Sequence, residues 1–163
     1  MKKAPERVGD RRLLKLAAFL EKLPPKRFDY GSYVGRDWKG MPDLSCGTTA
    51  CAIGWATTMP EFRKYGLCLL YARDRWNGFH VPCGGSHHDA PLAGTAIFSL
   101  NEAEWDYLFM PGSALYNEDY SGEEELRPQG PSSEATAKQV AQHIRRFVAW
   151  REKRRAKAKG AKR

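Results

Sequence analysis

The sequence predicts a mainly α fold with a small β-hairpin, that is, an α+β protein folded as a single compact domain. Three features support this fold class. Apolar residues recur at helical spacing near both ends of the chain, two capping boxes mark helix starts, and a strand-like run is followed by an Asn-Gly pair typical of turns. A chain of 163 residues with 42% hydrophobic content has enough apolar surface for one core.

We expect the first helix from about Asp10 to Leu23, after an N-terminal arm of residues 1–9. The carboxylate of Asp10 can cap this helix. Pro24 and Pro25 end it, because proline lacks the N–H that a helix needs and restricts the residue before it. The inward positions follow helical spacing: Leu13, Leu16, Ala17, Leu20 and Leu23.

A second helix is predicted to begin between Cys46 and Thr48 and to end near Thr58. Ser45, Thr48 or Thr49 could supply the capping oxygen. The helix is rich in small residues, which favours close packing of its backbone against another element. A short third helix is predicted over residues 61–65.

A β-hairpin is predicted directly after this third helix. Residues 67–72 are strand-like, and residues 79–81 could pair with them across Trp76-Asn77-Gly78, because Asn-Gly favours tight turns. Residues 84–91 combine glycine, serine and histidine and are predicted to form a loop.

Two more helices are predicted before the acidic loop, and the domain ends at residue 150 with a final helix. After a short helix over residues 92–98, Asn101 caps a helix over residues 102–110, and Glu104 completes its capping box. Residues 112–133 are acidic and polar and are predicted to be a long surface loop.

The final helix of the domain is expected to start with a capping box made by Thr136 and Gln139. Its apolar stripe consists of Val140, Ala141, Ile144, Phe147 and Val148. The apolar pattern stops after Trp150, so residues 151–163 are predicted to be a basic C-terminal tail that frays. The domain proper would therefore span residues 10–150.

The charge of the chain is unevenly distributed. Residues 145–163 contain ten Lys or Arg and one Glu, whereas residues 1–144 contain seventeen Lys or Arg and eighteen Asp or Glu. The formal net charge of +8 therefore belongs to the C-terminal segment.

Several sequence blocks together resemble a group of uncharacterised small bacterial and phage proteins. The most specific block is Cys-Gly-Thr-Thr-Ala-Cys-Ala-Ile-Gly-Trp-Ala at residues 46–56, and weaker matches are Pro60-Glu61-Phe62, Phe98-Ser99-Leu100 and residues 136–147. The resemblance covers roughly residues 10–150 and leaves out the basic tail. It implies a shared architecture and a phage or mobile-element origin, and it carries over no catalytic residues.

A thiol-dependent enzyme is one alternative function. Cys46 lies at a predicted helix start, where the helix dipole can lower the pKa of a thiol. His80, His87 or His88 could serve as the base, oriented by Asp89. The surrounding sequence matches no cysteine hydrolase signature.

A zinc-stabilised adaptor is a second alternative. Cys46, Cys51, Cys83 and His87 or His88 are the residue types of a structural zinc site. If both Cys46 and Cys51 lay on one helix they would face apart, since five residues correspond to a rotation of about 140°. Packing accounts for the thiols equally well, and Cys68 in particular is expected to be buried.

The basic tail is the strongest functional feature of the sequence. Closely spaced cations on a helix and its extension can neutralise phosphates and release counterions, which gives salt-sensitive binding with little sequence preference. The residues expected to bind nucleic acid are Arg145, Arg146, Arg151, Lys153, Arg154, Arg155, Lys157 and Lys159.

The sequence therefore predicts a small, non-enzymatic binding or regulatory protein without a cofactor. Its neutral core would recognise a protein partner, and its tail would contact nucleic acid. The absence of a secretory signal and of a long apolar run predicts a cytoplasmic protein that does not enter a membrane.

Overall fold

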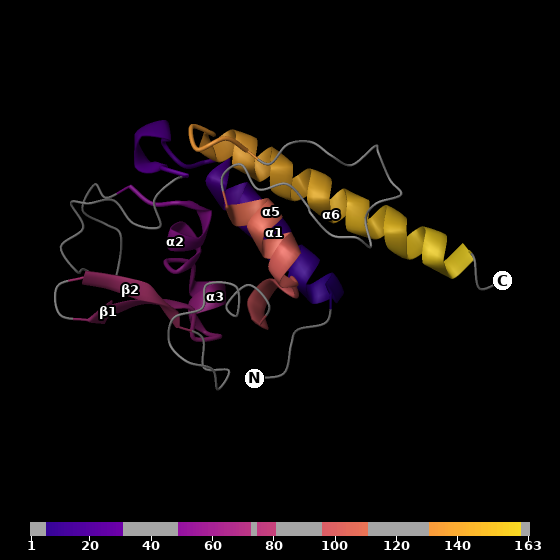
Figure 1. Ribbon diagram of the computed structural model, residues 1–163, viewed down its shortest axis with the longest axis horizontal. Coiled ribbons are helices and arrows are strands. Elements are labelled where there is room, and N and C mark those ends of the chain that lie inside the picture. Colours follow the sequence, from indigo (N-terminus) through magenta and orange to yellow (C-terminus); the bar gives the residue numbers. More distant parts are fainter. Residues whose placement is uncertain (1–5, 31–48, 73–74, 81–95, 111–130, 161–163) are drawn as a thin grey trace.

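The computed structural model describes residues 6–30, 49–72, 75–80, 96–110 and 131–160 (Figure 1). The elements in chain order are α1 (Glu6–Leu20), the 3₁₀ turn η1 (Pro25–Arg27), α2 (Ala52–Ala56), α3 (Pro60–Arg63), β1 (Cys68–Ala72), β2 (Arg75–His80), α5 (Glu102–Phe109) and α6 (Ala137–Gly160). In addition, residues 96–98 are helical. The described part of the chain is mainly α, as predicted.

The α+β fold class is wrong, because the described core is built from helices and their connections. β1 and β2 form an antiparallel ribbon that pairs Cys68 with His80 and Ala72 with Arg75. Two strands alone do not make a sheet layer that could support a core.

The predicted turn at Trp76-Asn77-Gly78 is also wrong, since all three residues lie inside β2. The register passes from the Leu70–Gly78 pair to the Tyr71–Trp76 pair and so skips Asn77. Asn77 is therefore the extra residue of a β-bulge. The unpaired Asn77 interrupts the regular ladder, which is what a bulge does, instead of reversing the chain.

The first and last helices, α1 and α6, pack against each other in antiparallel directions. Asp10, near the start of α1, contacts Arg151, and Glu21, just past its end, contacts Arg145. The apolar positions predicted for α1 from Leu13 to Leu20 are buried, and Leu23 is partly buried beyond the end of the helix. Figure 1 shows α6 as the longest helix, with its C-terminal half extending beyond the body of the protein.

α1 begins at Glu6 rather than at Asp10, so Asp10 lies inside the helix and does not cap it. The early start brings Gly9 against the connection before α5. A Cβ on Gly9 would lie 2.0 Å from the carbonyl oxygen of Phe98. Only glycine allows this close approach, and the next residue of the connection, Ser99, has a φ of 58°.

The capping box of α6 is confirmed, because the Thr136 hydroxyl accepts from the Gln139 N–H at 3.3 Å while Gln139 Oε1 accepts from the Thr136 N–H at 2.8 Å. Its predicted apolar stripe is buried as well. The predicted fraying after Trp150 is wrong, since the helix continues to Gly160. Arg151 and Arg155 take over the inward positions where the apolar stripe stops.

The capping box of α5 is also confirmed. Glu104 N–H donates to Asn101 Oδ1 at 2.8 Å, and Asn101 N–H donates to Glu104 Oε2 at 3.0 Å. The helix ends at Phe109, and its inward residues Trp105, Leu108 and Phe109 are buried.

The second predicted helix is shorter than expected. α2 begins at Ala52 with Cys51 at its N-cap, and no side chain caps it. The Nε1 of Trp55 donates to the carbonyl of Arg27 at 2.9 Å, and an isolated parallel bridge joins Phe28 to Ala50. These contacts tie α2 to the segment that follows α1, although they leave the start of the helix without the predicted side-chain cap.

The predicted boundaries of the domain both fall inside helices. α1 crosses the expected end of the N-terminal arm at residue 9, and α6 crosses the expected start of the tail at residue 151. Most of the predicted acidic loop, residues 111–130, lies outside the described residues.

Candidate nucleic-acid interface

Arg151 lies at the centre of a buried network of ion pairs. The sequence predicts instead that it belongs to a solvent-exposed basic tail. Only 2% of its side chain is exposed. The guanidinium donates to Asp10 Oδ1 at 3.1 Å, to Glu104 Oε1 at 3.2 Å and, more closely, to Glu104 Oε2, and it reaches the Ser99 carbonyl at 2.9 Å. Arg151 thereby joins α1, α5, α6 and the connection before α5.

Arg155 completes this network one helical turn further along α6. Its Nη2 lies 2.7 Å from Asp10 Oδ2, and its side chain is 22% exposed. Two carboxylates, Asp10 and Glu104, thus face two guanidinium groups, so the buried charges balance. A buried carboxylate is tolerated when it is paired and hydrogen-bonded in this way.

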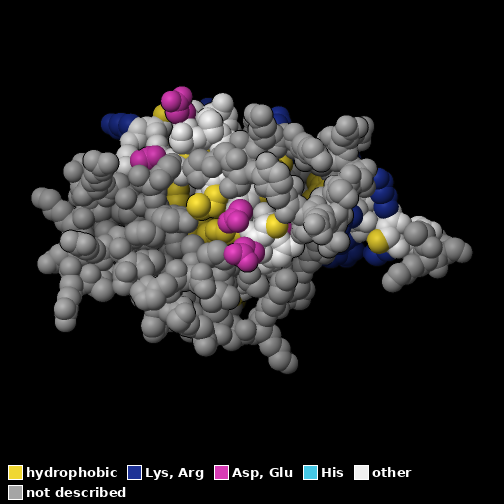
Figure 2. All heavy atoms as spheres, viewed as in Figure 1, with side chains coloured by type: hydrophobic (Ala, Val, Ile, Leu, Met, Phe, Trp, Pro, Cys, Tyr) yellow, Lys and Arg dark blue, Asp and Glu magenta, His cyan; other side chains and the backbone are white. Residues whose placement is uncertain are grey.

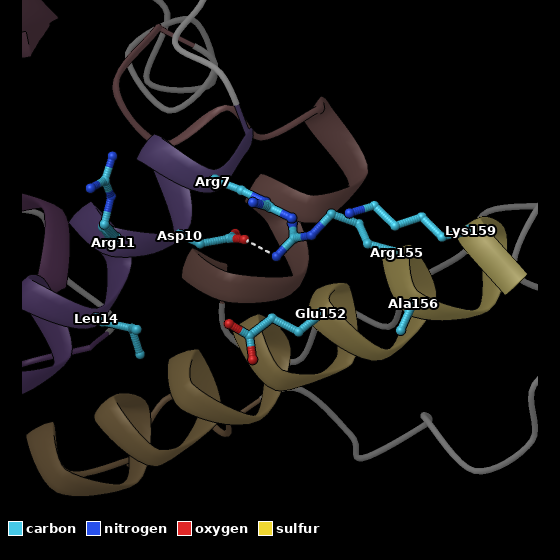
Figure 3. Close-up of a pocket in the computed structure, with 8 residues that line it drawn as sticks. All are labelled: Arg7, Asp10, Arg11, Leu14, Glu152, Arg155, Ala156 and Lys159. Carbon is cyan, nitrogen blue, oxygen red and sulfur yellow. Dashed lines mark ion pairs between the residues drawn. The ribbon is translucent and has the colours of Figure 1, made fainter.

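A groove of about 650 Å³ opens beside this network, between α1 and the C-terminal half of α6 (Figure 3). Each helix contributes four residues at positions i, i+3, i+4 and i+7, which share one helical face. The stripe on α1 is Arg7, Asp10, Arg11 and Leu14, and the stripe on α6 is Glu152, Arg155, Ala156 and Lys159.

The lining of the groove is predominantly cationic. Four Lys or Arg and two acidic residues line it, and the carboxylate of Asp10 is already bound by Arg151 and Arg155. In Figure 3 the side chains of Arg7, Arg155 and Lys159 extend toward the same end of the groove. Figure 2 shows Lys and Arg side chains gathered around the C-terminal half of α6.

A second hollow of about 200 Å³ lies on the neighbouring face of α1, against α3. It is lined by Val8, Arg11, Arg12, Lys15, Glu61, Lys64 and Tyr65. Lys15 contacts Glu61 at 3.5 Å, and Arg12 is held in place by donating to the carbonyl of Ile97 at 2.8 Å. Arg11 lines both hollows.

The side chain of Tyr65 stands among cations in this second hollow. The guanidinium of Arg12 lies 3.9 Å from the ring centroid, and the ammonium of Lys64 lies 5.0 Å from it. The hydrogen bond from Arg12 lowers the pKa of the Tyr65 hydroxyl, and the charges of Arg12 and Lys64 act in the same direction. The hollow therefore combines positive charge with an aromatic ring.

The eight cations predicted from the sequence have different environments. Arg151 is buried, so its assignment as a nucleic-acid-binding residue is corrected to a structural one. Arg155 and Lys159 line the groove. Arg145 forms two hydrogen bonds with Glu21, at 2.8 and 2.9 Å, which lower the pKa of Glu21. The remaining four are exposed on α6: Arg146, Lys153, Arg154 and Lys157.

The basic residues of α1 were missed by the sequence analysis. Arg7, Arg11, Arg12 and Lys15 occur among acidic residues in a segment that is nearly neutral as a whole. Counting charge over long segments therefore concealed them. The 7–11 and 11–15 spacings, each of four residues, were the available signal, because residues four apart share one face of a helix.

The residues proposed for a thiol enzyme or a zinc site are mostly outside the described ranges. Cys46, Cys83, His87 and His88 all lie there. Cys51 is buried, and burial raises the pKa of its thiol to about 11, so it is a neutral thiol near pH 7. Cys68 is exposed, against our expectation of burial. Within the described residues, no group of three His, Cys, Asp or Glu could hold a metal ion.

A buried histidine on α6, His143, is a further residue that the sequence did not predict. Its Nε2–H donates to the Tyr107 carbonyl on α5 at 3.0 Å, and its ring lies 4.4 Å from the Tyr107 ring. Burial lowers the pKa of His143, the hydrogen bond to Tyr107 opposes that shift, and the charge of Arg146 adds to it. His143 is thus a neutral core residue at pH 7.

No helix among the described residues has the length and apolar character needed to cross a membrane. No protein family, curated protein or solved structure matches the chain at a significant level. The resemblance of residues 46–56 to small bacterial and phage proteins therefore stays a prediction. The groove between α1 and α6 is the feature from which a function is argued.

Proposed function

We propose that this chain is a small, non-enzymatic binding protein of the cytoplasm that holds the phosphate backbone of nucleic acid in the groove between α1 and α6. The observation that carries the proposal is the convergence of two cationic stripes from opposite ends of the chain onto one hollow. Lys and Arg arranged in this way neutralise phosphates and release counterions.

The geometry supports a binding surface better than an ordinary solvated face. Arg155 is held by Asp10, which Arg151 holds in turn, so the groove has a rigid wall. Among the described residues, no ion pair involves Arg7, Arg11 or Lys159. These three cations border the groove and are available to phosphate oxygens.

The test compares the wild type with the double variant Arg7→Glu/Lys159→Glu. Affinity for a labelled, mixed-sequence oligonucleotide is measured by fluorescence anisotropy from about 50 to 200 mM salt. We expect the double variant to bind at least about tenfold more weakly, with a shallower dependence of affinity on salt.

Lys26→Glu/Lys138→Glu is the matched control, because it changes the net charge by the same four units at two exposed residues that do not line the groove. This variant should bind almost like the wild type. Equal weakening by the control and by the groove variant would show that net charge alone governs binding. No binding by the wild type to either single-stranded or duplex nucleic acid would overturn the proposed function.

A further inference from the structure

We propose that the ligand is single-stranded nucleic acid, whose backbone passes from the α1–α6 groove over Arg11 into the α1–α3 hollow, where one base stacks at Tyr65. This inference rests on the proposed function and specifies its ligand. It assigns a specificity role to Tyr65 and a bridging role to Arg11.

The two hollows lie on adjacent faces of the same helix. The residues of α1 that line the second hollow are shifted by one position from those that line the groove. One position corresponds to a rotation of about 100°, or about 10 Å along the surface of a helix with its side chains. A strand that follows the cations can therefore occupy both hollows by bending around α1.

Arg11 is the residue that makes this path continuous. It lines both hollows, with Arg7 on the side of the groove and Lys15 on the side of the second hollow. These cations lie four residues apart on α1, about 6 Å along the helix axis. The backbone thus meets a positive charge at each step between the two hollows.

The aromatic ring in the second hollow favours a single strand over a duplex. Proteins that bind single strands combine a cationic track with aromatic rings on which bases stack. A base in a duplex is already stacked and paired, so it cannot reach Tyr65 without unstacking. Arg12, fixed by the carbonyl of Ile97, holds its planar guanidinium over the ring, which adds a second flat surface on which a base can stack.

The test measures binding of a single-stranded oligonucleotide and of the matching duplex to the wild type, Tyr65→Leu and Tyr65→Phe. Base–aromatic stacking corresponds to about 5- to 150-fold in affinity. We expect Tyr65→Leu to lose an effect of this size for the single strand and to leave duplex binding unchanged. Tyr65→Phe, which keeps the ring, should bind the single strand like the wild type.

A second measurement uses the wild type alone, so it does not depend on how well a variant folds. An abasic oligonucleotide of the same length carries the same phosphates without bases and should bind more weakly than the normal strand. Equal binding of abasic and normal strands, or unchanged binding by Tyr65→Leu, would overturn the inference. The proposed function would survive that result, provided that the Arg7→Glu/Lys159→Glu variant still binds weakly.

Discussion

Arg151 occupies a position that helical spacing assigns to the apolar stripe of α6. Its guanidinium carbon lies over the Phe147 ring, 4.8 Å from the centroid, while its nitrogens bind two carboxylates. The side chain therefore continues the packing of the stripe and also neutralises Asp10 and Glu104. Because a charged residue is usually exposed, the residue type argues against burial of Arg151, although its position in the helical spacing matches that of the buried stripe.

Arg151→Met should destabilise the protein by about 3–5 kcal/mol, because the buried carboxylate of Glu104 loses the guanidinium that binds it and the buried carboxylate of Asp10 keeps Arg155 but loses Arg151. Arg154→Met is the control, since Arg154 is exposed and its charge lies over the Trp150 ring at 5.1 Å. Urea denaturation of both variants measures the difference. A loss below about 1 kcal/mol for Arg151→Met would mean that water or a neighbouring group replaces the guanidinium.

Gly9→Ala should destabilise the protein by about 1–3 kcal/mol, because the new methyl group would overlap backbone atoms of Phe98 and force α1 away. Gly160→Ala is the matched control, since a Cβ there meets nothing within 4 Å. That control should leave the free energy of unfolding unchanged or raise it by up to about 1 kcal/mol. Equal effects of the two substitutions in urea denaturation would contradict the close approach of α1 to Phe98.

At the scale of elements, the sequence predicts helices best where the determinants are local. The capping boxes of α5 and α6 each lie within four residues, and both form as predicted. The start of α1 was misplaced because the carboxylate of Asp10 binds residues of α6 instead of a nearby N–H. The starts of α5 and α6 are thus encoded locally, while the residue expected to start α1 is used in a contact with a distant segment.

The same distinction between local and distant determinants applies to the candidate interface. The part on α6 could be predicted because its cations are concentrated in one short segment. The part on α1 was not predicted, because its cations belong to residues 1–144, whose charges nearly cancel as a whole, and they form a groove only when α6 packs alongside. Tyr65 carried no signal in the sequence, since its role depends on Arg12 lying above its ring.

The contact between α5 and α6 should weaken in mild acid. The pKa of His143 in the folded protein lies below its ordinary value of 6.5, so the unfolded chain takes up the proton first as the pH falls. The stabilising contribution is therefore complete above about pH 6.5 and is lost as the pH falls below it. Unfolding in urea at about pH 7.5 and about pH 5.5 should reveal lower stability at the lower pH.

His143→Gln separates this effect from the titration of other groups. Glutamine can donate to the Tyr107 carbonyl and does not titrate. The variant should lose less stability than the wild type between the two pH values. An identical loss in both proteins would assign the pH dependence to groups other than His143.

Across the whole molecule, most of the charge that the sequence assigns to a frayed tail belongs to a helix whose cations have two different environments. Up to Arg155 its inward cations support the fold, and beyond that residue its cations are exposed. Removing all of residues 151–163 would therefore test folding and binding together. The appropriate truncation ends the chain at Arg155.

A chain that lacks residues 156–163 should keep its fold and bind nucleic acid more weakly. It retains Arg151 and Arg155 and is missing the exposed residues Lys157 and Lys159. Its free energy of unfolding should change by less than about 0.5 kcal/mol. For a single strand, the slope of the logarithm of the binding constant against the logarithm of the salt concentration should become shallower. Its magnitude should fall by about 0.7 for each phosphate that the shortened helix no longer neutralises. Unchanged affinity would place the binding surface elsewhere.

The long separation between Asp10 and Arg151, 141 residues along the chain, also affects how the protein is made. At synthesis rates of about 5–20 residues per second, Arg151 follows Asp10 out of the ribosome by on the order of 10 s. During that interval the apolar face of α1 has no α6 to cover it, and the carboxylate of Asp10 has no guanidinium. A nascent chain stalled before α6 would therefore expose an amphipathic helix, which is the kind of surface that chaperones bind and that promotes aggregation.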